Sequence, residues 1–110
     1  MASTLKRAKL QAVGTVATQL TTGTETTPAM GKVWNIPRLY VCNKTASDVT
    51  AHVSHQTAAT NTYLCYNRTI KAYDTQLFEN LVLLNGDSVY VTSSAATSLD
   101  VFGSILEEDA

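Results

Sequence analysis

The sequence predicts an all-β fold: a single-domain antiparallel β-sandwich of the jelly-roll kind, with about seven to eight short strands. Apolar and polar residues alternate in several short segments, which is the period of a half-buried strand. Turn residues separate these segments at regular spacing, and no segment has a helical period. The chain also contains 17 Thr and 8 Ser among its 110 residues. Thr is branched at Cβ and therefore favours strands.

A chain of this length is one domain by size and has room for a single modest core. We expect an extended N-terminal arm over residues 1–10, a β-sandwich domain over 11–106 and an acidic C-terminal tail over 107–110. The first segment is basic and has too few apolar residues for an amphipathic helix. Its candidate docking residues are Leu5, Lys6, Arg7, Lys9 and Leu10. Two explanations of the oppositely charged ends stay open: solvated tails, or arms that dock on neighbouring subunits.

The expected strands are separated by polar or glycine-containing turns. They cover residues 11–20, 32–42, 48–54, 63–70 and 88–92, and a last strand that begins near Leu99. Residues 75–80 are a short strand or a connection, and 81–84 form an apolar segment before the next turn. Gly14 weakens the first strand. Pro37 cannot donate to a ladder, so it marks an edge, a bulge or a break. The segment 48–54 has the clearest alternation, with Val49, Ala51 and Val53 on its core side.

Residues 81–106 are expected to form a β-hairpin around which the core is organised. The chain enters it through the Asn85-Gly86-Asp87 turn, where Asn and Gly tolerate positive φ. It reverses through the small residues 93–97. The side chains expected on its core side are Val89, Val91, Leu99, Val101 and Ile105.

Large side chains also occupy the opposite faces of several strands. A sheet that is solvated on one side does not need them there. Either the strand registers differ slightly from those expected, or a second face is buried against another chain. The second explanation defines a candidate subunit interface, which consists of Tyr40, Leu64, Tyr66, Tyr90, Phe102 and Leu106.

The sequence contains no nucleophile elbow, phosphate-binding loop or dinucleotide fingerprint, so we expect neither an enzyme nor a cofactor site. His52 and His55 have opposite strand parity, which argues against a metal site. The net charge of −1 and the scarcity of basic residues among the aromatic ones argue against nucleic-acid binding. No apolar run approaches the roughly 20 residues of a membrane span, and no secretory signal is visible. We therefore expect a soluble protein made in a cytoplasm.

Two further groups of residues leave alternatives open. Cys42 and Cys65 are either buried free thiols or members of a disulfide, within the chain or between subunits. The aromatic residues are either core and interface residues or a sugar-stacking face. That second group consists of Trp34, Tyr40, Tyr63, Tyr66 and Tyr73.

The order of several segments gives a resemblance to a known group of proteins. After the short basic start come VCNKTASDVTAHV, then YLCYNRTI, then LVLLNGDSVYVTSSAATSLDVFGSILEE. This order resembles small tailed-bacteriophage virion structural proteins, in which a strand ending in Cys-Asn precedes an alternating strand. A Leu-Asn-Gly-Asp-Ser turn and a final strand ending in acids follow. The resemblance covers roughly residues 33–108, and Pro37 and Cys65 depart from it.

The resemblance implies a β-sandwich, commonly a homotrimer, attached to the outside of a capsid, neck or tail. Members of this group are decoration or cement, neck-collar and fibre-like proteins. The implied partners are other copies of the chain and capsid, portal, neck or tail proteins, and the implied location is the virion. The alternative is a fibre-type binding module that recognises carbohydrate on the host surface.

Overall fold

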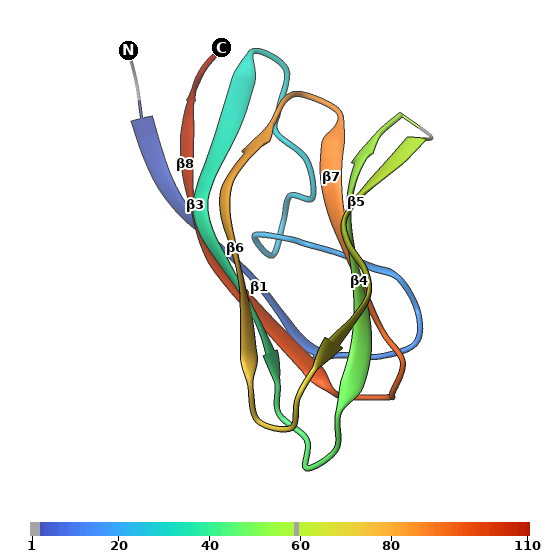
Figure 1. The fold of residues 1–110 in the computed structure, drawn as a ribbon. Coiled ribbons are helices and arrows are strands. Elements are labelled where there is room, and N and C mark those ends of the chain that lie inside the picture. Colours follow the sequence, from blue (N-terminus) through green and yellow to red (C-terminus); the bar gives the residue numbers. More distant parts are fainter. Residues whose placement is uncertain (1–2, 59) are drawn as a thin grey trace.

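The computed structural model describes residues 3–58 and 60–110, which form a β-sandwich of two four-stranded sheets (Figure 1). The strand order is β1-β8-β3-β6 in sheet A and β2-β7-β4-β5 in sheet B, and all pairs are antiparallel. The strands are β1 (Ser3–Val13), β2 (Thr18–Gln19), β3 (Lys32–Asn43), β4 (Val49–Thr57), β5 (Thr60–Ile70), β6 (Thr75–Leu83), β7 (Asp87–Ser93) and β8 (Leu99–Asp109).

Every connection except that between β4 and β5 crosses from one sheet to the other. Such crossing connections between two four-stranded sheets are those of a jelly roll. The predicted all-β sandwich of seven to eight strands is therefore confirmed. Among the described residues, no helix is long and apolar enough to cross a membrane.

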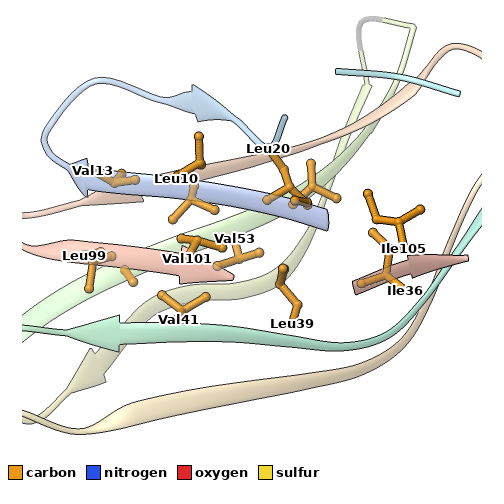
Figure 2. Close-up of a cluster of buried hydrophobic side chains, with 14 of the residues drawn as sticks. Leu10, Val13, Leu20, Ile36, Leu39, Val41, Val53, Leu99, Val101 and Ile105 are labelled. Carbon is orange, nitrogen blue, oxygen red and sulfur yellow. The ribbon is translucent and has the colours of Figure 1, made fainter. Parts of the chain in front are cut away.

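The core lies between the two sheets and is formed mainly by alternate side chains of β1, β3, β4, β7 and β8 (Figure 2). Sheet A contributes Leu39 and Val101, and sheet B contributes Val53, all of them fully or almost fully buried. The five core residues expected around the last two strands are all buried, and they are Val89, Val91, Leu99, Val101 and Ile105. Alternation along the strands thus identified the core side correctly.

The predicted N-terminal arm is wrong for residues 3–10, and Met1 and Ala2 lie outside the described residues. Residues 3–10 belong to β1, which pairs with β8 from Ser3↔Glu108 onward. The predicted acidic tail is also a strand, because β8 continues to Asp109 between β1 and β3. The pattern was concealed because Lys6 occupies a position on the inner side of β1, where acidic side chains pair with it.

The predicted hairpin over residues 81–106 is also wrong. Strands β6 and β8 belong to sheet A, whereas β7 belongs to sheet B. The turn after β6 forms as expected, with Gly86 at φ 89° and the Asp87 amide bonded to the Leu84 carbonyl at 2.9 Å. However, the Asn85 side chain and the Gly86 amide bond the loop before β3, which holds the turn at the corner between sheets. A turn motif reverses the chain without specifying which sheet receives the next strand.

Pro37 lies in a bulge of β3, one of the three features its position predicted. Between Asn35 and Leu39, β3 has one residue more than the facing part of β8. β3 has a neighbouring strand on both sides in sheet A. Because Pro37 lies in the bulge, the ladder with β8 needs no N–H donor at this position. The predicted strand over 11–20 is likewise interrupted at Gly14, and β2 keeps only two residues.

Candidate functional site

The outer face of sheet A carries two rows of exposed apolar side chains. In the first row, Tyr40 of β3 lies opposite Phe102 of β8 on one side and opposite Leu77 of β6 on the other. In the second row, Leu5 of β1 lies opposite Leu106 of β8. Val82 of β6 continues this row beyond Asn35. We name these six residues the apolar face: Leu5, Tyr40, Leu77, Val82, Phe102 and Leu106. Their exposed fractions range from 36% to 75%.

The bulge at Pro37 hollows this face between its two rows. Pro37 lines a cavity of about 200 Å³ together with Leu106 and Val82. It also lines a second cavity of about 410 Å³ together with Tyr40 and Phe102. Large apolar residues beside shallow pockets are the features that concentrate binding energy in protein interfaces.

The exposed charges at the two edges of sheet A have opposite signs. Arg7 and Lys9 are exposed on the edge strand β1, and Lys9 lies opposite Phe102. Glu79 is exposed on the other edge strand, β6. The apolar face therefore lies between Arg7 and Lys9 at one edge and Glu79 at the other, and the exposed Arg38 of β3 lies opposite Glu79.

A charged network lies at the end of the sandwich where β1, β3 and β8 meet. The Lys6 Nζ atom lies 2.6 Å from Glu25 Oε1 and 2.9 Å from Glu107 Oε2. Trp34 Nε1 donates to Glu107 at 2.8 Å. The hydrogen bond from Trp34 lowers the pKa of Glu107 most, and the bond from Lys6 lowers it further. The hydrogen bonds that Lys6 donates to Glu25 and Glu107 raise the pKa of Lys6.

This network decides the roles of two residues that the sequence singled out. Lys6 belongs to an ion pair within its own chain, so it is not free to serve as part of a docking arm. Trp34 is 1% exposed and therefore cannot form part of a sugar-stacking face. Leu10 is buried in the core, whereas Leu5 joins the apolar face.

The candidate subunit interface divides between different surfaces. Tyr40, Phe102 and Leu106 come together on the apolar face. Tyr90 lies on β7, in the other sheet. Leu64 and Tyr66 lie on β5, an edge strand of that other sheet.

Two residues of the apolar face, Leu77 and Val82, were missed from the sequence, and Leu5 was assigned to a docking arm instead of to this face. Leu5 lies in the segment expected to be an arm. Leu77 and Val82 have opposite parity in sequence, and Asn80 between them has φ 57°. This irregularity brings both side chains to the outer face, where Leu77 faces Tyr40 and Val82 faces Asn35. Continuing the strand through residues 75–83 with one irregular position would have revealed them.

Both cysteines are free thiols, and they lie in different sheets. Cys65 of β5 packs against the core and donates to the Ala51 carbonyl at 3.6 Å. Burial raises the pKa of the Cys65 thiol. Cys42 of β3 follows the buried Val41 and is partly exposed opposite Asp100. A disulfide between the two cysteines of one chain is therefore absent.

The two histidines point to different surroundings. His55 Nε2 lies 3.2 Å from Asp87 Oδ2, beside the corner between β6 and β7. His52 contacts the rings of Tyr63 and Tyr66. Within residues 3–58 and 60–110, no group of three His, Cys, Asp or Glu side chains is arranged to hold a metal ion.

Comparisons with known proteins show a similarity in fold. No protein-family model and no curated protein matches the sequence. Among solved structures, the chain is similar to one from Bacillus endospore appendages, described as a novel family of disulfide-linked pili. The TM-score is 0.56 and the identity is 13%, over 98% of this chain and 87% of that chain. A similarity at this identity supports the β-sandwich fold and carries no functional residue across.

Proposed function

We propose that this chain is a non-enzymatic structural component of a tailed-phage virion. In this proposal it forms an oligomer, a trimer, that decorates or sheathes the capsid or the neck and collar and reinforces the particle. The observation that carries the structural role is the apolar face, with six large apolar side chains in adjoining rows on one sheet. Soluble monomers seldom expose large contiguous apolar patches, and such patches mark sites of association.

The size of the face supports assembly from several contacts rather than from one. Burying a large apolar side chain completely contributes about 1.5–3 kcal/mol. Six side chains that are about half exposed thus contribute on the order of 5 kcal/mol, close to the lower estimates of the cost of association. A single contact of this kind would be weak. A closed oligomer bound repeatedly to a particle would be durable because its contacts act together.

The charges at the edges of sheet A support a head-to-tail arrangement of copies. In a cyclic oligomer, the same edge of each subunit meets the opposite edge of the next subunit. Arg7 and Lys9 on β1 of one copy would then approach Glu79 on β6 of its neighbour. Opposite charges at the rim favour this register and disfavour an approach of two identical edges.

The virion assignment rests on the resemblance over residues 33–108 and agrees with the use of a similar fold elsewhere. The similar solved chain belongs to pili, which are structural appendages. The low share of charged residues, 15% against about 25% in ordinary soluble domains, also suits a subunit whose surface is covered by other protein.

Mass measurement by light scattering tests the oligomer. We expect the wild-type chain to have three times its monomer mass of 11.9 kDa. Phe102→Glu should give a folded monomer, because it places a charge in the centre of the apolar face. Met30→Glu is the matched control, since Met30 is 88% exposed in the loop before β3. A wild-type monomer at high concentration would contradict the proposed oligomer.

Electron microscopy of purified phage particles, labelled with an antibody against the chain, tests the virion assignment separately. We expect label on the capsid or on the neck and collar. If purified particles lack the chain while the isolated protein is a trimer, the virion assignment is wrong and the role of the apolar face stands.

A further inference from the structure

The outer face of sheet B carries a groove that the structural role does not use. Its volume is about 290 Å³, and β4, β5 and β7 supply most of its walls. Tyr63 of β5 and Tyr90 of β7 are its two tyrosines, and His52 of β4 lies between these strands in the sheet. This volume lies near the lower end of the range for small-ligand sites, roughly 300–1,000 Å³.

Irregularities in β5 gather aromatic rings at this groove. Tyr63 and Tyr66 have opposite parity and would lie on opposite faces of a regular strand. However, β5 contains two bulges relative to β4. One extra residue lies between Tyr63 and Cys65, which pair with Ser54 and Val53, and another lies between Cys65 and Arg68, which pairs with Ala51. The ring centroids of Tyr63 and Tyr66 consequently lie 4.9 Å apart, with the rings at 80°. The His52 ring lies 4.4 Å from that of Tyr66.

A backbone hydrogen bond selects the tautomer of the neutral His52 ring. The Asn67 amide donates to His52 Nδ1 at 3.1 Å. Since Nδ1 accepts this bond, the proton of the neutral ring lies on Nε2, which can donate to a ligand. The contacts among the three rings and this bond hold the aromatic cluster in place before a ligand arrives.

Apart from His52 and the two tyrosines, the polar side chains of the groove carry no ionisable group. They are hydroxyl and amide side chains: Ser54, Gln56, Asn61 and Thr92. Together they offer donors and acceptors in similar numbers. No lysine, arginine, aspartate or glutamate is among the described residues that line the groove. A phosphate or carboxylate ligand would favour lysine or arginine partners, which this lining does not supply.

We propose that this groove binds a neutral oligosaccharide. A sugar ring has apolar C–H faces that suit the Tyr63 and Tyr90 rings. Its hydroxyl groups both donate and accept, which matches the neutral amide and hydroxyl lining. Tyr63 is 48% exposed and available for such a contact.

The groove and the apolar face lie on opposite sides of the sandwich. The groove therefore stays accessible when sheet A is covered by another protein. In an oligomer, several identical grooves would act together and raise a weak single-site affinity for a surface that displays many copies of the glycan.

A glycan array followed by titration tests the proposal. The full chain is applied to an array of neutral and acidic oligosaccharides, and the strongest neutral binder is titrated against the ¹⁵N-labelled protein by NMR. We expect saturable shifts confined to residues of β4, β5 and β7. Tyr63→Ala should weaken binding by about tenfold or more, whereas Tyr63→Phe should retain most of it, because the ring face is kept. Tyr73→Ala is the matched control, because Tyr73 is 71% exposed and lies outside the groove.

Three results would overturn the proposal: no neutral glycan bound on the array, a stronger response to acidic glycans, or unchanged affinity in Tyr63→Ala. NMR dispersion of the variant excludes unfolding as the cause of a loss. The test is independent of oligomer formation, since Phe102→Glu should still bind the soluble oligosaccharide and Tyr63→Ala should keep the wild-type mass.

Discussion

A Cβ atom on Gly103 of β8 would lie 2.9 Å from the Cδ1 atom of Leu39 and 3.1 Å from the Arg38 carbonyl oxygen. Both neighbours belong to the part of β3 that the bulge at Pro37 displaces. The bulge and the glycine therefore form one structural unit. Gly103 is paired with Leu39, where the bulge ends, and β3 approaches β8 so closely there that no side chain fits on Gly103.

Gly103→Ala should destabilise the protein by about 1–3 kcal/mol, because the fully buried Leu39 side chain must move in a packed core. Urea unfolding measures the change. Ser104→Ala, at the exposed neighbouring position, is the control and should change the free energy of unfolding by less than about 0.5 kcal/mol. Equal stabilities of the two variants would contradict the close packing of β3 on β8.

Asn43→Ala should be among the most destabilising polar substitutions in the chain. The fully buried Asn43 side chain donates to the carbonyls of Ser47 and Ile70 at 2.8 and 3.0 Å and accepts from the Thr45 amide at 3.0 Å. It thereby holds two neighbouring loops together. We expect a loss of about 2–4 kcal/mol in the free energy of unfolding, since buried polar groups lose their partners.

The matched control for this substitution is Asn61→Ala, at an exposed position of β5. Thermal and urea unfolding of both variants provide the measurement. If both substitutions cost the same, the bonds from Asn43 do not stabilise the loops as the geometry indicates.

The stability of the protein should decrease in acid through Asp87. Burial acts to raise the pKa of this carboxylate, but the bonds from the Leu84 amide and the Thr57 hydroxyl, with the nearby His55, outweigh it and leave the pKa below 3.8. The folded state therefore binds fewer protons than the unfolded state. This stabilisation is complete above about pH 4 and is lost as the pH falls through the folded-state pKa.

Comparison with Asp87→Asn measures this contribution. We expect the wild type to be more stable by about 2 kcal/mol near pH 5, with a difference that narrows toward pH 2. Urea unfolding across this range provides the data. If the difference in the free energy of unfolding between wild type and Asp87→Asn does not vary with pH, the charge of Asp87 does not contribute to stability.

The two cysteines should differ in reactivity. Burial raises the pKa of Cys65, so its thiolate is scarce at neutral pH and its sulfur lies against the core. In iodoacetamide labelling followed by mass spectrometry, we expect Cys65 to react about tenfold more slowly than a free thiol. Single-cysteine variants Cys42→Ser and Cys65→Ser separate the two sites. Any disulfide between subunits should require Cys42, and a cross-link that persists in Cys42→Ser would contradict this.

The sequence predicted the fold class, the core side of most strands and an edge, bulge or break at Pro37, because each depends on local pattern. Alternation identified Val89, Val91 and Val101 as core residues without knowledge of their partners. Pro37 could be interpreted because its missing N–H restricts any strand in the same way.

The errors arose where distant parts of the chain determine the structure. Residues 3–10 looked like an arm because the acids that pair with Lys6 are Glu25 and Glu107, far away in the sequence. The Asn85-Gly86-Asp87 turn was identified, but the sheet that follows it depends on bonds to the loop before β3. The apolar face combines residues from four strands, and no local pattern reports that they are neighbours.

The central position of β8 in sheet A means that this sheet, and the apolar face on it, cannot form before β8 has been synthesised. β8 lies between β1 and β3. It supplies one residue to each row of the apolar face: Phe102, between Lys9 and Tyr40, and Leu106, between Leu5 and Asn35. In a nascent chain whose β8 has not yet left the ribosome, β1 and β3 lack the strand that lies between them. Such a chain cannot present the surface through which copies would associate.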